Sequence, residues 1–157
     1  MTLFKRIFGG KPQSHEAIIF TSIPQSWSVL RSENNGMPMI VRKNLGCEKI
    51  AGHSEYTTSC GIAFKILLPS AEGLPNFDLE PSLNEMEDDI FDILESDLNS
   101  IVPIVITTSR FREFVIYTKD LNEFQKRLES LRSKYSQYEL TSFSKPDPNW
   151  RTYKSFN

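Results

Sequence analysis

The sequence predicts an α+β domain in which two helices cover one face of an antiparallel sheet. Two stretches, 82–99 and 120–136, carry apolar residues at three- and four-residue steps, which is the spacing of an amphipathic helix. Four short runs rich in β-branched and aromatic residues alternate with these helices, as strands do. A length of 157 residues, with 39% hydrophobic and 24% charged residues, suits one ordinary globular domain.

A β-hairpin is predicted over residues 27–43, ahead of the other elements. Asn34, Asn35 and Gly36 lie between its two apolar arms, and both residue types tolerate the positive φ of a tight turn. Pro38 lacks a backbone N–H, so we expect its arm to be an edge strand or an irregular strand. The hairpin either extends the sheet or covers one of its edges.

From residue 61 onward the predicted order is β-α-β-β-α-β, the pattern of ferredoxin-like folds. The predicted strands cover residues 61–68, 102–108, 113–118 and 138–143. Both helices then lie on one face of an antiparallel four-stranded sheet, and the strand at 61–68 is expected near its centre.

Both helices begin with the spacing of a capping box, in which a side chain accepts from the backbone N–H three residues on. The two pairs are Ser82 with Glu85 and Asp120 with Glu123. The apolar face of the first helix consists of Leu83, Met86, Ile90, Leu94 and Leu98. That of the second consists of Leu121, Phe124, Leu128, Leu131 and Tyr135.

The first residues combine an apolar stripe with basic side chains. The stripe consists of Leu3, Phe4, Ile7 and Phe8. One interpretation of residues 1–11 is a short helix that makes weak contact with a membrane surface or docks on a partner. The other is a frayed terminus that packs loosely on the domain. We assign residues 1–25 to a partly flexible N-terminal tail and residues 26–157 to a single domain.

Composition and hydropathy also bear on cellular location. The apolar residues at the start are interrupted by Lys5 and Arg6, so no secretory signal is predicted. No apolar run reaches the roughly 18 residues that a membrane span needs. Two cysteines do not build a disulfide scaffold. These features predict a cytoplasmic protein without a membrane span, in which Cys47 and Cys60 are reduced thiols.

Several short residue groups occur along the chain in a characteristic order. They are Trp27, Gly36-Met37-Pro38, Gly73-Leu74-Pro75, Leu83, Glu87-Asp88, Arg112-Glu113, Tyr117 and Asp147-Pro148-Asn149-Trp150 followed by Tyr153. In this order and spacing, residues 26–156 resemble the bacterial family called domain of unknown function 695. That family is related in architecture to the ribonuclease E inhibitor, regulator B. The resemblance implies a ferredoxin-like α+β domain without known enzyme activity.

The sequence departs from that family's pattern at two places. The turn before Arg112 carries Ser109-Arg110-Phe111, where the family usually has a glycine, and the tail ends at Phe156-Asn157 without the usual closing proline. These departures concern the geometry of the turn and the docking of the tail, and they leave the predicted fold unchanged.

Charge is distributed unevenly along the chain. The net charge is −2, which argues against a nucleic-acid binder, since such domains are usually clearly basic. Residues 66–109 contain ten acidic residues and no lysine or arginine, whereas the segments on either side are each net +4. The acids of the first helix lie mostly off its apolar stripe and predict an exposed negative face. This face comprises Glu85, Asp88, Asp89 and Asp92.

Four interpretations of this acidic face are open. It is a solvated surface, or it steers a partner with a basic surface. It is instead partly neutralised by the second helix, or it holds a divalent cation loosely, although no EF-hand spacing is present. The basic residues of the second helix are Lys126, Arg127, Arg132 and Lys134.

The sequence lacks the common motifs of enzymes and metal sites. It contains no phosphate loop, no G-x-G-x-x-G, no H-E-x-x-H and no G-x-S-x-G. Cys47, His53 and Cys60 are separated by gaps that match no usual zinc site, and a fourth ligand is missing. We therefore predict no metal, no cofactor and no catalytic residue.

Charged residues on a predicted core strand form a second candidate site. Alternation along the strand places Arg112, Phe114 and Ile116 on one face and Glu113, Val115 and Tyr117 on the other. Since Phe114 and Ile116 are apolar, their face is expected to meet the helices, where Glu87 or Asp88 could pair with Arg112. The group Glu87, Arg112, Glu113 and Tyr117 is then either a ligand-binding rim or a structural ion pair.

These observations favour a non-enzymatic domain that binds a protein or regulates one, and that uses its acidic helix face. Trp150, Tyr153 and Trp27 are candidate aromatic anchors for a partner, since Trp and Tyr often dominate interfaces. The competing interpretation is that they pack against the sheet and close the domain. One alternative function is a metal-dependent hydrolase or nuclease-like enzyme that uses the acidic cluster. Another, within the binding class, is an immunity or antitoxin protein.

Overall fold

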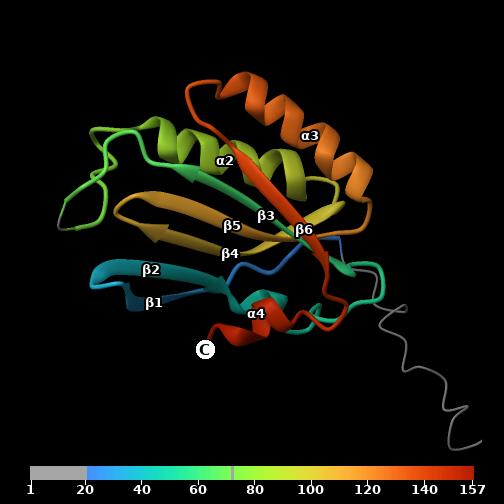
Figure 1. Cartoon of the computed structure of the whole chain (residues 1–157). Helices are drawn as coiled ribbons and strands as arrows, with labels where there is room; N and C mark the ends of the chain where they lie inside the picture. The colour runs from blue at the N-terminus through green and yellow to red at the C-terminus, as the bar shows by residue number, and fades with distance from the viewer. Residues whose placement is uncertain (1–20, 72) are drawn as a thin grey trace, which may run out of the picture.

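The computed structural model describes residues 21–71 and 73–157 (Figure 1). The predicted helix within residues 1–11 lies outside the described residues. The chain begins with strands β1 (Trp27–Asn34) and β2 (Met37–Asn44) and a 3₁₀ turn, η2 (Leu45–Cys47). The predicted core follows as β3 (Thr58–Lys65), α2 (Ser82–Glu95), β4 (Ser100–Thr108), β5 (Phe111–Thr118), α3 (Leu121–Lys134) and β6 (Thr141–Pro146). A short helix, α4 (Arg151–Ser155), comes last.

The strands form one six-stranded antiparallel sheet in the order β1-β2-β4-β5-β3-β6. Elements β3 to β6 keep the predicted β-α-β-β-α-β order. The hairpin extends the sheet beside β4, so the strand order as a whole is not that of a strict ferredoxin-like fold. The α+β class is confirmed. Strand β3, which was expected near the centre, lies between β5 and the edge strand β6.

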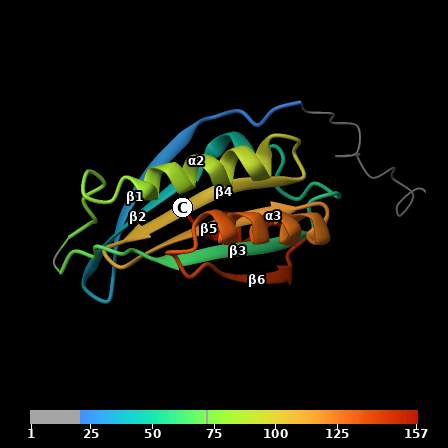
Figure 2. The same cartoon turned by 90° about the horizontal axis from the view of Figure 1, so that it is seen from above.

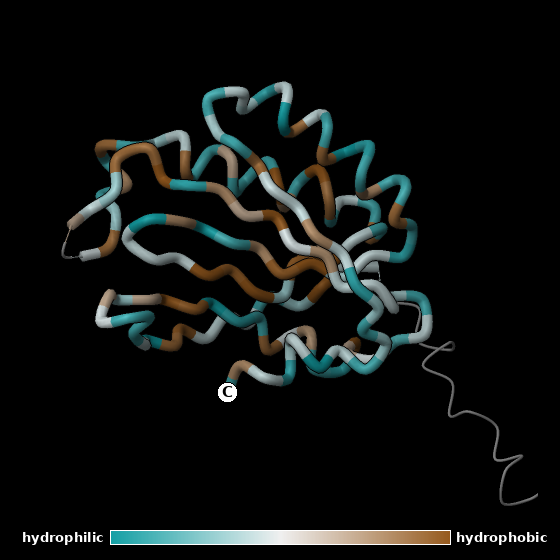
Figure 3. The backbone as a smooth tube through the Cα atoms, viewed as in Figure 1, coloured by the Kyte–Doolittle hydropathy of each residue, from teal (hydrophilic) through white to brown (hydrophobic). Residues whose placement is uncertain are grey.

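The sheet separates two layers of apolar side chains. Figures 1 and 2 show which elements cover each face of the sheet. Helices α2 and α3 cover one face, as predicted, and we call this the helix face. Helix α4 and the segment around η2 cover the opposite face, which we call the C-terminal face. In Figure 3 the hydrophobic colour follows the inner strands, while the outer surfaces of the helices are largely hydrophilic. The inner strands β4 and β5 are therefore buried from both sides, whereas the edge strands β1 and β6 are largely exposed.

The two helices begin in different ways. Asp120 caps α3 as predicted, because its side chain accepts from the backbone N–H groups of Asn122 and Glu123. The predicted capping box of α2 is wrong. Pro81 occupies the N-cap position and makes no side-chain cap, and the hydroxyl of Ser82 lies 2.7 Å from that of Tyr138 instead. Tertiary contact thus replaces the local cap.

Helix α2 ends at Glu95, about one turn earlier than predicted. Leu98 has a φ of 60°, which a helix cannot contain, and its carbonyl accepts from the hydroxyl of Tyr56 at 2.5 Å. Leu98 therefore belongs to the turn that leads into β4, and it packs against the core of the C-terminal face rather than continuing the helical stripe.

The expectation for the arm that contains Pro38 is wrong, because β2 is an inner strand and β1 forms the edge. Pro38 lies opposite Glu33 of β1, whereas pairing between β2 and β4 begins at Met39. The proline thus lies just beyond the ladder on that side, where its missing N–H disrupts no pairing with β4.

The structure offers no candidate for a membrane crossing in the part of the chain that it describes, since no helix there is long and apolar enough.

Candidate binding pocket

A pocket of about 290 Å³ opens on the helix face, between the hairpin, α2 and the loop that precedes α2. Its lining residues are Val29, Ile40, Arg42, Leu74, Phe77, Asn84, Glu87, Thr107 and Arg112. Four of these side chains are apolar, three are charged and two are neutral and polar. An apolar chamber with a few convergent polar groups is the usual composition of a ligand site.

The floor of the pocket is set by the register of three neighbouring strands. Ile40 of β2 lies opposite Thr107 of β4, and Thr107 in turn lies opposite Arg112 of β5. Side chains in register across a sheet point to the same face. The alternation that places Ile40 there also places Arg42 on that face, two residues along. The pairing of the hairpin with β4 therefore brings Arg42 beside Arg112.

Arg112 is the most buried charged group in this pocket, with 2% of its surface exposed. Its Nε donates to the hydroxyl of Thr107 at 3.0 Å, and its guanidinium carbon lies 4.9 Å from the ring centroid of Phe77. Its Nη1 is buried and has no hydrogen-bond partner among the described residues. Burial lowers the pKa of Arg112 and Glu87 opposes this shift, but a guanidinium stays protonated at neutral pH.

Glu87 connects the two arginines. Its Oε1 accepts from Arg42, and its Oε2 lies 3.6 Å from Nη1 of Arg112, which is too long for a hydrogen bond. The Glu87 side chain is 12% exposed and that of Arg42 is 34% exposed, so Arg42 lies at the mouth and Arg112 at the bottom. The described lining residues carry a net charge of +1, which suits a singly charged anion.

The predicted pairing of Arg112 with Glu87 is confirmed, and so is the position of Phe114 and Ile116 in the helix-face core. Glu113 and Tyr117 lie on the other face of β5, as alternation requires. Burial raises the pKa of Glu113. The four residues of the predicted rim therefore do not form one site. Sequence reasoning missed Arg42, for which the only signal was a charged residue two positions after the apolar Ile40 on a predicted hairpin arm.

The acidic face is divided between solvent and α3. Three of its residues are exposed, as predicted, and we call them the outer acids: Glu85, Asp88 and Asp92. Asp89 is not fully exposed, because it pairs with Lys134 and accepts from the hydroxyl of Tyr135. These two hydrogen bonds lower the pKa of Asp89. The interpretation in which α3 neutralises part of α2 therefore holds for this residue.

A second bridge joins the C-terminal end of α2 to α3. Arg127 donates to both carboxylate oxygens of Asp97, at 2.8 and 2.6 Å, and also pairs with Glu123 of its own helix. The bonds from Arg127 hold the pKa of Asp97 well below its usual range.

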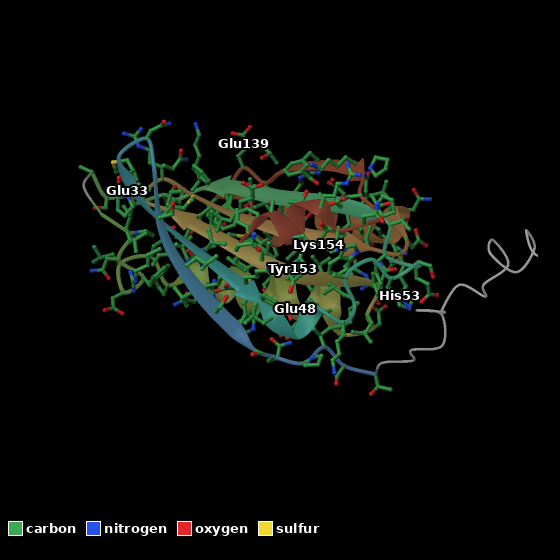
Figure 4. The ribbon with its side chains drawn as sticks, turned by 90° about the horizontal axis from the view of Figure 1, so that it is seen from below. Glu33, Glu48, His53, Glu139, Tyr153 and Lys154 are labelled. Atoms are coloured by element: carbon green, nitrogen blue, oxygen red, sulfur yellow. The ribbon has the colours of Figure 1, made fainter. Side chains whose placement is uncertain are left out.

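The structure places two of the candidate aromatic anchors inside the domain. Trp150 is fully buried, stacks on Tyr117 with ring centroids 3.9 Å apart, and donates from Nε1 to the carbonyl of Tyr56. Tyr153, labelled in Figure 4, is buried on the same face. Neither ring is available to a partner, so these two residues close the domain. Trp27 is partly buried and lies edge-on to Phe91 of α2.

The sulfur and imidazole groups do not converge. Cys60 belongs to the core of the helix face, whereas Cys47 belongs to that of the C-terminal face. His53 is buried near Tyr56, and its Nδ1 accepts from the backbone N–H of Glu55. Burial raises the pKa of both thiols to about 12. Among the described residues no group of three histidine, cysteine or acidic side chains could hold a metal ion.

The six-stranded sheet, the two helices on one face and the buried arginine beneath an apolar chamber define a small α+β domain that contains a pocket. By comparison with family models, the chain belongs to the Family of unknown function (DUF695), whose model matches residues 25–156. This confirms the resemblance seen in the sequence, while a relation to the ribonuclease E inhibitor is not shown. No curated protein and no solved structure matched the chain.

Proposed function

We propose that this protein is a non-enzymatic binding or regulatory domain that recognises a protein partner at the pocket and the adjoining outer acids. The observation that carries this proposal is the Nη1 of Arg112, a buried charged donor without a hydrogen-bond partner among the described residues, in an apolar pocket. An unsatisfied buried donor costs about 1–3 kcal/mol, and an acceptor supplied by a partner would recover that cost.

The pocket is better suited to recognition than to catalysis. Its one carboxylate, Glu87, is already paired with arginine, and the hydroxyl of Thr107 already accepts from Arg112. Catalysis instead needs a nucleophile or a general base that is free to act on a substrate. The outer acids lie along the exposed side of one helix, and among the described residues no group of three acidic, histidine or cysteine side chains could hold a metal ion. This supports a binding surface over the alternative of a metal-dependent hydrolase or nuclease-like enzyme.

The outer acids extend the site toward a basic partner. Asp88 follows Glu87 directly and lies four residues from Asn84, and both of those residues line the pocket. A partner whose anchoring group enters the pocket could therefore place basic side chains against Glu85, Asp88 and Asp92. Such contacts at the rim raise association rates and weaken with salt. An immunity or antitoxin protein would be one member of this class.

Because both cysteines are free thiols, the cytoplasm is the compartment in which we propose to look for the partner.

The test combines a pull-down with a binding measurement. Tagged protein captures partners from lysate of the source cell at low and high salt, beside Asp88→Lys/Asp92→Lys, Arg42→Gln and the control Glu139→Lys. Glu139, labelled in Figure 4, is exposed after α3 and is not one of the residues that line the pocket. Asp89 is left unchanged because it pairs with Lys134.

The proposal expects one partner that is bound by the wild type and by Glu139→Lys and is lost from both other variants. Its affinity is then measured by calorimetry with purified components. Equal retention of every captured protein by all four chains would show that this face is only a solvated surface.

A further inference from the structure

We propose that the pocket receives the C-terminal residue of the partner protein, with its free carboxylate on Arg112 and its apolar side chain against the chamber walls. This inference rests on the proposed function and names the chemical group that is recognised. The required chemistry is a single carboxylate joined directly to an apolar group, and a C-terminal residue carries both on one Cα atom.

The charges of the pocket favour a monoanion. Among the lining residues, Arg42 and Arg112 contribute two positive charges and Glu87 one negative charge. The buried carboxylate of Glu80 acts on Arg112 from behind the lining. A carboxylate oxygen that hydrogen-bonds to Nη1 of Arg112 would satisfy the donor that the protein leaves without a partner among the described residues. Phosphate is a poorer match because its second negative charge would face Glu87, and a metal cation would face two arginines.

The walls of the pocket favour an apolar body beside that carboxylate. Val29, Ile40, Leu74 and Phe77 line the chamber, and Phe77 also lies over the guanidinium of Arg112. An aspartate or glutamate side chain carries only one or two methylene groups next to its carboxylate, so it would leave most of these walls exposed to water. A C-terminal leucine or phenylalanine would cover them.

The size of the pocket and its surroundings fit a peptide end. A cavity of about 290 Å³ lies at the lower limit of small-molecule sites, which suits the end of a peptide better than a larger ligand. Asn84 at the rim offers an amide donor and an acceptor to the last peptide group. Residues that precede the C-terminus would leave the pocket beside the outer acids, where basic side chains are favoured.

The experiment is an NMR titration of the isotope-labelled full chain with matched probes. The probes are acetyl-Lys-Lys-Gly-Leu with a free carboxylate, the same peptide with a C-terminal amide, and N-acetylleucine. The free-acid peptide should shift the resonances of residues around the pocket, and the amide should bind at least about tenfold more weakly, since a charge-assisted hydrogen bond is lost. N-acetylleucine should bind the same site more weakly than the peptide, because it lacks the two lysines.

Two variants should change the affinity in opposite directions. Arg42→Gln removes a positive charge and should weaken the free-acid peptide about tenfold. Glu87→Gln removes the internal carboxylate and should strengthen binding about threefold or more, because two arginines are then available to the ligand. Lys126→Gln, on the exposed side of α3, is the charge control and should bind like the wild type. Arg112→Met should abolish binding if it folds; if it does not fold, the first two variants decide.

The outcomes separate the two proposals. If the free acid and the amide bind equally, or if Glu87→Gln weakens the free acid, the carboxylate inference is overturned. If N-acetylleucine binds as tightly as the peptide, a free small acid rather than a C-terminus is the ligand, and the inference falls in that form. A lysate partner that depends on Arg42 and the outer acids would still support the proposed function in either case.

Discussion

The two faces of the sheet contain similar residue types, charged and aromatic, in different arrangements. On the helix face, charged side chains surround a cavity, and the buried donor of Arg112 is left without a hydrogen-bond partner among the described residues. On the C-terminal face, Trp150, Tyr153 and Asp147 are buried in a hydrogen-bonded cluster. Motif residues shared with the family occur on both faces. A shared aromatic residue therefore need not mark a binding surface, and a shared charged pair can mark a pocket.

The cluster on the C-terminal face is organised by Asp147. This carboxylate accepts from the hydroxyl of Tyr117 at 2.7 Å and from the backbone N–H groups of Arg151 and Thr152 at 2.9 and 3.0 Å. Burial alone would raise the pKa of Asp147, but these hydrogen bonds lower it overall. Trp150, which precedes α4, has a φ of 54°, a conformation that this cluster holds in place.

Replacing Trp150 by alanine should have the largest effect on stability. The substitution removes a fully buried ring, its stacking on Tyr117 and its hydrogen bond to Tyr56. The free energy of unfolding should fall by about 3–5 kcal/mol, measured by chemical denaturation. Trp27→Ala is the matched control, and it should cost less because Trp27 is only partly buried. Equal losses from the two variants would contradict the distinction drawn between their environments.

Asp147→Ala should cost about 2–4 kcal/mol, because a buried hydroxyl and two N–H groups lose their acceptor together. The pKa of Asp147 is lowered in the folded state, so its contribution is present above the unfolded pKa of about 4 and is lost as pH falls through the folded pKa. Denaturation measured across this range should show wild type and variant converging in acid. A gap that stays constant with pH would show that the charge of Asp147 contributes nothing.

Glu95 provides a test with the opposite dependence on pH. Burial raises its pKa to about 7, against a smaller opposing effect of the hydrogen bond from the backbone N–H of Val102. Because the folded pKa is above the unfolded value, folding is favoured at low pH, and this advantage is lost as pH rises from about 4.5 to 7.

Glu95→Gln keeps an acceptor for Val102 and removes the charge. It should therefore be more stable than the wild type above pH 7, by on the order of 1–2 kcal/mol, and should show little advantage near pH 4. Thermal denaturation across this range checks the prediction. A variant that is less stable than the wild type at pH 8 would show that Glu95 is stabilising as an anion.

The sequence predicted local order well and tertiary convergence poorly. Periodicity and turn residues identified α2, α3 and the six strands but not η2 or α4. Alternation along β5 predicted that Arg112 meets Glu87 or Asp88, and the structure pairs it with Glu87. The pocket depends on more distant facts. Arg42 reaches it only because the hairpin pairs with β4, and Phe77 reaches it from a loop without periodic structure. Trp150 was ambiguous for a similar reason, since an aromatic residue in a polar tail fits either an interface or a core.

Asp88→Lys should have the smallest effect on stability and a clear effect on binding. Asp88 and Asp92 are exposed and one turn apart, so their repulsion disfavours the helix by a few tenths of a kcal/mol. The lysine converts this pair into an attractive one, and the free energy of unfolding should rise by about 0.2–0.5 kcal/mol at low salt. The gain should vanish at high salt, where exposed charges are screened.

Affinity for a basic partner should fall in the same Asp88→Lys variant. A loss of stability would indicate that Asp88 has a structural contact. Unchanged affinity, in a variant of unchanged fold, would confine recognition to the pocket.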